Sequence, residues 1–119
     1  MALISVLFQK NAKLAACLVR DDAHVKLGDK GEHVSKIQTA VCRLEGYTII
    51  YDDIKHMHYG RSTAAAVLAF KRKRKIVNHA YQTQADDIVG KMTIAALDRE
   101  IAALERLPRY NNSGLWEAN

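Results

Sequence analysis

Two histidines lie close to two carboxylates in the middle of the chain, and these side chains can bind a metal ion. His56 and His58 are separated by one residue, and Asp52 and Asp53 precede them. Protein zinc sites use tetrahedral sets of histidine, cysteine and carboxylate ligands. No cysteine lies near these histidines in the sequence, and no Glu-x-x-His helix motif accompanies them. We therefore expect exposed loop histidines here rather than a metal site, and no cofactor is predicted.

The sequence also contains no pattern that predicts a catalytic centre. There is no Gly-x-Ser-x-Gly elbow and no glycine-rich phosphate loop, and no base stands beside the scattered serines and cysteines. Cys17 and Cys42 are too few for a disulfide framework. One bridge between them could form, but we expect two reduced thiols in apolar surroundings. The chain is predicted not to be an enzyme.

Five consecutive cations, Lys71 to Lys75, form the densest charge run in a chain of net charge +5. Such a run can neutralise the phosphates of a nucleic acid or bind an acidic wall polymer. At the C-terminal end of a predicted helix, the same cations also complement the helix dipole while remaining solvated. We favour the second interpretation, and nucleic-acid binding stays a secondary hypothesis.

A glycine followed three positions later by threonine occurs twice, and each copy predicts the start of a helix. Gly60 precedes Thr63 and Gly90 precedes Thr93. The two glycines are 30 residues apart, and so are the two threonines. A cation follows each glycine. The first N–H groups of a helix lack partners within it, and hydroxyl side chains commonly accept from them. We expect each unit to be a glycine turn that leads into a helix capped by its hydroxyl residue.

Apolar residues at helical spacing predict three helices. The first begins at Glu32 and stops at Gly46, and the others span residues 62–74 and 92–106. Their expected buried residues are Val34, Ile37, Val41, Leu44, Ala66, Val67, Phe70, Thr93, Leu97, Ile101 and Leu104. Residues 47–51 are β-branched and aromatic and predict a short strand, with connectors at 52–58 and 76–85. The predicted fold is all-α, a small three-helix bundle with a glycine-turn/helix pseudo-repeat and long irregular loops.

The 119 residues suit one domain with additions at both ends. Residues 1–24 are expected to pack on the core as an extension, with Asn11 capping a helix over 12–18. Residues 25–107 form the domain, and 108–119 a flexible tail. Leu14 to Cys17 has the form of a lipoprotein cleavage box, but an apolar segment precedes the basic residues, the reverse of a signal peptide. We expect a chain that is cytoplasmic as synthesised, for which any delivery elsewhere needs a dedicated secretion route or lysis. No window approaches a membrane span of ~18 apolar residues.

The motifs also follow one another in a recognisable order. The first run consists of Leu27, Gly31, Val34, Ile37, Gln38, Leu44, Gly46 and Tyr47, and the segments Tyr59–Phe70 and Val89–Leu97 come after it. From about residue 25 to 100 this order and spacing resembles the peptidoglycan-binding-like domain family. The resemblance implies a non-enzymatic three-helix module that holds cell-wall glycan-peptide, often to position a hydrolase. Asp52-Asp53 and Asp86-Asp87 stand where the family usually has Asp-Gly, so the loops that would carry binding are altered.

Recognition of peptidoglycan needs an aromatic platform, hydrogen-bonding groups and a cation for the stem peptide. The predicted ligand-binding residues are Tyr47, Asp53, Tyr59, Arg61 and Lys91. The tyrosines and the aspartate come together if the 46–60 segment folds back on the bundle. The two cations stand at predicted helix starts, where backbone N–H groups favour an anion. In the alternative interpretation the tyrosines pack at the edge of the core and the cations are solvated.

These observations predict non-catalytic binding of bacterial cell-wall peptidoglycan. The alternative is a protein-interaction module in a secretion or phage-tail-like assembly or effector complex, whose partner would be an effector or a hydrolase. No membrane partner is expected.

Overall fold

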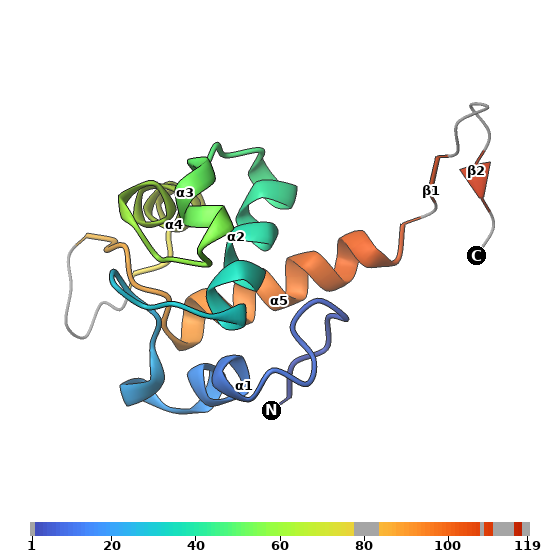
Figure 1. Ribbon diagram of the computed structural model, residues 1–119. Coiled ribbons are helices and arrows are strands. Elements are labelled where there is room, and N and C mark those ends of the chain that lie inside the picture. Colours follow the sequence, from blue (N-terminus) through green and yellow to red (C-terminus); the bar gives the residue numbers. More distant parts are fainter. Residues whose placement is uncertain (1, 78–83, 108, 111–115, 118–119) are drawn as a thin grey trace.

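The computed structural model describes residues 2–77, 84–107, 109–110 and 116–117. These ranges contain five α-helices, one 3-10 helix and two two-residue strands (Figure 1). The elements are α1 (Ala12–Val19), η1 (Asp21–Ala23), α2 (Glu32–Glu45), α3 (Tyr51–Lys55), α4 (Arg61–Lys73), α5 (Lys91–Glu105), β1 (Arg109–Tyr110) and β2 (Trp116–Glu117). The predicted all-α class is confirmed.

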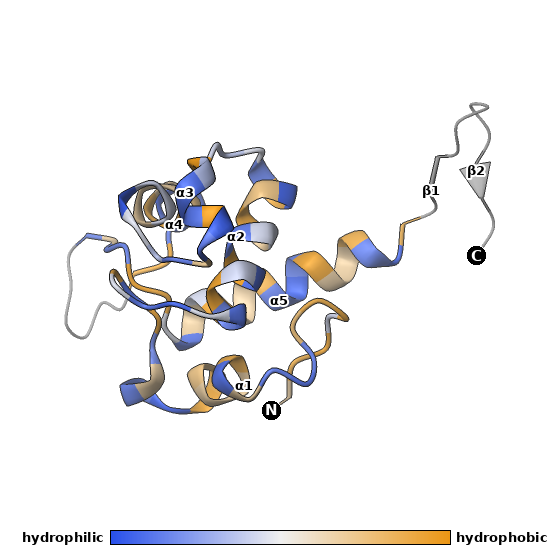
Figure 2. Ribbon diagram, viewed as in Figure 1, coloured by the Kyte–Doolittle hydropathy of each residue, from blue (hydrophilic) through white to orange (hydrophobic). Residues whose placement is uncertain are grey.

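Helix α5 is the element that the two sides of the core share. It packs against α1 on one side and against α2 on the other, and α2 in turn packs against α4 (Figure 1). Figure 2 shows apolar and polar residues alternating along α5, as burial of only part of a helix surface requires. The largest fully buried side chains include Phe8, Leu14, Ile37, Phe70 and Leu97. Phe8 and Leu14 precede residue 25, so the N-terminal segment contributes to this core.

The predicted ends of the helices agree with the structure to within about a residue. Asn11 caps α1, because its side-chain oxygen accepts from the backbone N–H of Leu14 at 3.0 Å. Gly46 ends α2 in the left-handed conformation with φ 68°, which glycine adopts at little cost. Helices α4 and α5 each begin one residue earlier than predicted, at Arg61 and Lys91.

The expected threonine caps are wrong. The residues at the cap positions of α4 and α5 are Gly60 and Gly90, and neither helix has a side-chain cap hydrogen bond. Thr63 and Thr93 stand in the first turn and are both buried. At that position the side chain faces the interior, where the hydroxyl of Thr63 accepts from Nε2 of Gln38 at 3.0 Å.

Two further predictions are wrong. Residues 47–50 form no strand, and the short helix α3 begins at Tyr51, the last residue of the expected strand, and continues into the expected loop. Asp52 and Asp53 lie in the first turn of α3, where carboxylates complement the helix dipole. Leu104 is 39% exposed rather than buried. It lies near the end of α5 that extends beyond α2 and α4 in Figure 1.

Two carboxylates on α5 bind the N-terminal segment. Asp98 accepts hydrogen bonds from the backbone N–H groups of Ile4 and Ser5 at 2.9 and 2.8 Å. Glu105 accepts from the next two N–H groups at 2.8 and 3.0 Å. These bonds satisfy four consecutive donors of an irregular segment, and so hold it along the last helix.

The segments that precede α2, α4 and α5 are hydrogen-bonded to one another. Val25 and Val89 exchange two backbone hydrogen bonds, at 2.9 and 2.8 Å. The N–H of Gly28 donates to the carbonyl of Tyr59 at 3.0 Å, and the N–H of Gly31 donates to that of Met57 at 3.0 Å. The starts of the three longest helices are therefore tied together through their backbones.

Part of the expected irregular structure lies outside the described residues, namely 78–83 of the connector and most of the predicted flexible tail, 108–119. Within that tail, β1 and β2 pair antiparallel, with Arg109 opposite Glu117 and Tyr110 opposite Trp116.

Candidate functional site

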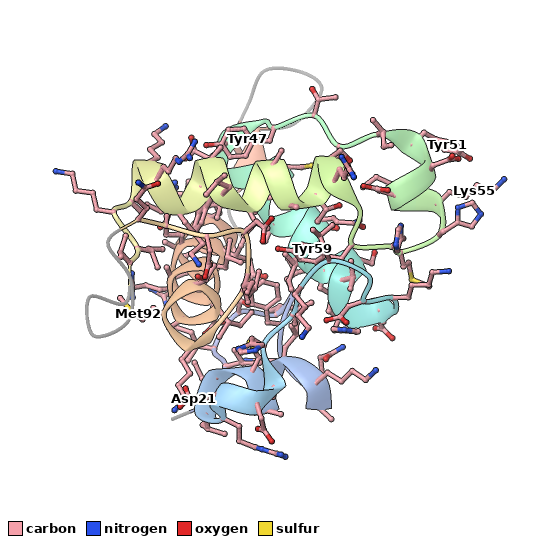
Figure 3. The ribbon with its side chains drawn as sticks, turned by 90° about the vertical axis from the view of Figure 1, so that its left-hand side faces the viewer. Asp21, Tyr47, Tyr51, Lys55, Tyr59 and Met92 are labelled. Carbon is pink, nitrogen blue, oxygen red and sulfur yellow. The ribbon has the colours of Figure 1, made fainter. Side chains whose placement is uncertain are left out.

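Tyr59, the expected aromatic platform, is fully buried. Its hydroxyl donates a hydrogen bond to the backbone carbonyl of Asp87. Burial, and secondarily the nearby carboxylate of Asp87, raises the pKa of the phenol well above its ordinary value. Figure 3 shows Tyr59 in the interior, whereas Tyr51 and Lys55 project at the edge of the molecule. Tyr59 therefore ties the segment before α4 to the segment before α5.

Asp53 is also buried and engaged by the protein itself. Its carboxylate accepts from the hydroxyl of Ser62 at 2.7 Å, and a ring nitrogen of His58 lies 3.7 Å away. The Ser62 hydroxyl in turn accepts from the N–H of Ile50 at 3.1 Å. Asp53 thus joins α3 to the first turn of α4.

The remaining three predicted residues do not meet on one surface. Tyr47 is half-buried, and its backbone carbonyl accepts from the Cys42 thiol at 3.2 Å. Arg61 is exposed at the start of α4. Lys91, at the start of α5, forms an ion pair with Asp21 at 3.3 Å. Tyr47 and Asp21, the ion-pair partner of Lys91, appear at opposite ends of the view in Figure 3.

The histidines before α4 were the candidate metal ligands. In the described ranges, no three histidine, cysteine or acidic side chains are grouped so that they could hold a metal ion. A ring nitrogen of His56 instead lies 3.0 Å from the backbone carbonyl of Asp52.

The expectation that the 71–75 cations are solvated is wrong for two of them. The Lys71 amine is buried, and it donates to the Asp86 carboxylate at 2.6 Å and to the carbonyl of Ile88 at 2.8 Å. The guanidinium of Arg74 pairs with Glu100 on α5 at 2.5 Å and with Glu45 on α2 at 2.7 Å. These cations join α4 to neighbouring segments. Arg72 and Lys75 are exposed.

A cleft of about 260 Å³ opens between α1 and the segment that leads into α2. Its polar lining residues are Lys13, His24, Asp29, Lys30 and His33, and its apolar ones are Ala16, Ala23 and Val25. Three separate parts of the chain form it, because Lys13 and Ala16 belong to α1, His33 belongs to α2, and the others lie between these helices. A second hollow, of about 320 Å³, is lined mainly by apolar residues of the N-terminal segment and α1.

His33 is the buried polar residue of the cleft, with 6% of its surface exposed. Neither ring nitrogen forms a hydrogen bond with a described residue. The ring packs against Gly31, where an added Cβ would lie 3.1 Å from Nδ1. Burial lowers the pKa of His33; the charge of Lys13 lowers it further, and Asp29 opposes this. The imidazole is therefore neutral at neutral pH.

The charged groups around His33 are mainly cationic. Lys13 and Lys30 are exposed, and neither forms an ion pair within the described residues. Asp29 is the single carboxylate among the described lining residues, and it accepts from the N–H of Lys26 at 3.0 Å. Two ammonium groups, a neutral imidazole and an apolar wall suit a ligand that presents an anionic group on a small aliphatic portion.

None of these cleft residues was predicted from the sequence. A signal was present, because histidines and lysines flank the Gly28–Gly31 turn on both sides. The contribution of Lys13 has no such signal, since the packing of α1 against the rest of the fold determines it.

No protein-family model, curated protein or solved structure significantly matches this chain. Among the described helices, none combines the length and apolarity that crossing a membrane requires.

Proposed function

We propose that the chain is a non-catalytic module that binds bacterial cell-wall peptidoglycan. In this proposal α2, α4 and α5 are the three-helix bundle expected from the sequence, and the units at Gly60 and Gly90 are its pseudo-repeat. The observation that carries the proposal is the backbone connection among the segments before these helices, each of which has a glycine at its N-terminal cap, Gly31, Gly60 or Gly90. This is the kind of scaffold that the sequence resemblance implies.

Exposed cations are the groups that this scaffold offers to a cell-wall ligand. Peptidoglycan presents sugar hydroxyls, acetamido groups and stem-peptide carboxylates, and the carboxylates are its anionic groups. Arg61 and the lysines of the cleft are exposed, so they can bind such groups without rearrangement of the core. Tyr59 and Asp53, which are buried, support the scaffold in this proposal. Delivery to the wall would require a dedicated secretion route or lysis.

Co-sedimentation with purified sacculi tests the proposal. We expect the folded protein to pellet with sacculi at low salt, and to be released in part by added salt because exposed charges contribute. The protein without sacculi is the control for aggregation. Protein that stays in the supernatant with sacculi at low salt contradicts the proposal.

The alternative function, a protein-interaction module in a larger assembly, has a separate supporting observation. Ile50, Tyr51 and Ile54, on and beside α3, expose 57%, 73% and 40% of their surfaces. Exposed apolar side chains that gather on one element favour a protein contact. The test is affinity purification from the native cell, comparing the wild type with a Tyr51→Ser, Ile54→Ser double variant. A stoichiometric partner that only the wild type retains supports this function, and no partner argues against it.

A further inference from the structure

We propose that the cleft between α1 and α2 binds a carboxylate of the peptide stem of peptidoglycan. The inference rests on the proposed function and goes further by naming the part of the polymer and the residues involved. Those residues are Lys13, Lys30 and His33, which line one cleft although they lie on different segments.

The balance of charge in the cleft favours an anion. Lys13 and Lys30 provide two ammonium groups, and Asp29 provides one carboxylate. The Asp29 carboxylate accepts from the backbone N–H of Lys26. An ammonium that is not already paired gains most from a carboxylate oxygen, because a charge-assisted hydrogen bond is stronger than one between neutral groups.

His33 gives the cleft a second, independent feature of a binding site. The residue exposes 6% of its surface, and its imidazole has no hydrogen-bond partner among the described residues. The ring nitrogens are not among the fully buried polar atoms that lack a partner, so they border the open cleft, where a ligand can reach them. The neutral ring carries one N–H donor and one acceptor nitrogen, and a ligand in the cleft would provide the missing acceptor.

The size and the apolar lining favour the peptide stem over the glycan. The volume of about 260 Å³ lies below the range of about 300–1,000 Å³ typical of pockets that enclose drug-sized ligands. It suits one end of a peptide better than a disaccharide. Ala16 and Ala23, which are half-buried, offer methyl groups to an aliphatic side chain.

A pair of soluble fragments tests the inference directly. One is the disaccharide–tetrapeptide muropeptide, and the other is the same disaccharide without its peptide. In an NMR titration we expect the muropeptide alone to shift the His33 ring signals. The Lys13→Ala, Lys30→Ala double variant should bind about tenfold or more weakly, as loss of charge-assisted contacts predicts. Arg72→Ala, which removes an exposed cation of α4, should bind as the wild type does.

His33→Gln is the second variant, because it keeps hydrogen-bonding groups at the site. Circular dichroism verifies that each variant folds. Weaker binding by a folded His33→Gln variant supports a contact at the imidazole. Equal perturbation by both fragments, or none by either, overturns the inference.

Sedimentation with whole sacculi separates this inference from the function on which it rests. Sacculi with intact stems are compared with sacculi whose stems an amidase has removed. Equal binding to both supports peptidoglycan binding but overturns the peptide-stem inference. If neither kind of sacculus binds while the muropeptide shifts His33, the proposed function fails and the carboxylate site stands.

Discussion

The carboxylate of Asp53 fills the space that a side chain on Gly60 would need. A Cβ on Gly60 would lie 2.3 Å from Oδ1 of Asp53, far inside contact distance. At the matching position of the second unit, a Cβ on Gly90 would meet nothing within 4 Å. Both glycines have ordinary negative φ values, −93° and −105°, so only the close approach of Asp53 distinguishes them.

We predict opposite outcomes for alanine at these two glycines. Gly60→Ala should destabilise the protein by about 1–3 kcal/mol, because the clash forces Asp53 away from Ser62. Gly90→Ala should be neutral or stabilise by up to about 1 kcal/mol, since alanine restricts the unfolded chain. Urea denaturation of both variants measures these changes in the free energy of unfolding. Equal destabilisation by the two substitutions would contradict the assigned role of Asp53.

Substitutions at the neighbouring residues Lys71 and Arg72 should have different effects on the stability of the protein. Lys71→Met should destabilise by about 1–3 kcal/mol, because it removes the buried amine from the Asp86 carboxylate and the Ile88 carbonyl. Arg72→Ala, at an exposed position, should change the free energy of unfolding by about 0.5 kcal/mol or less. Urea denaturation again provides the comparison. A Lys71 variant as stable as the wild type would show that the buried pair contributes no net stability.

Acidification should destabilise the protein in part through His33. Its pKa in the folded state lies below the ordinary value of 6.5, so the unfolded chain binds a proton first as the pH falls. The stability that a neutral His33 contributes is fully present above pH 6.5, and is lost as the pH falls from there towards the lowered pKa. Thermal denaturation between pH 7.5 and pH 5, about the range where histidines titrate, measures the slope of stability against pH. His33→Gln should flatten it. The same slope in the wild type and in this variant would rule out His33 as the cause.

The two free cysteines should differ in reactivity. Burial raises the pKa of the Cys17 thiol to about 11. Cys42 is less buried, and desolvation raises its pKa as well. Because the thiolate is the reactive form, we expect iodoacetamide to modify Cys42 first and Cys17 only after unfolding. Mass spectrometry of native and urea-treated protein checks the order. Equal labelling of both residues in the native protein would contradict it.

The sequence predicted the elements whose signals are local. Periodic apolar residues identified α2, α4 and α5, and Asn11 and Gly46 marked helix ends because capping depends on a few neighbouring residues. Residues 47–51 were assigned to a strand on composition alone, but strand formation needs a partner and none of the described segments pairs with them. Thr63 was wrongly assigned as a helix cap, because α4 starts earlier than expected and the hydroxyl of Thr63 faces Gln38.

The candidate site depends on contacts between distant segments, and for that reason the sequence predicted it poorly. Tyr59 and Asp53 are the residue types that bind glycans, yet the fold uses both internally. Lys71 stood in a run of cations that favoured solvation, and its burial is explained by the Asp86 carboxylate and the Ile88 carbonyl beside it. The approach of α1 that brings Lys13 near His33 likewise has no counterpart in a sequence pattern.

The attachment of residues 4–7 to Asp98 and Glu105 joins positions 93 to 99 residues apart in the chain. During synthesis the first apolar residues, Phe8 and Leu14 among them, therefore emerge from the ribosome long before the helix that covers them. Until α5 has been made, these residues lack the cover that it provides. Contacts between such distant positions also slow folding. Completion of the native state must therefore wait for the synthesis of α5.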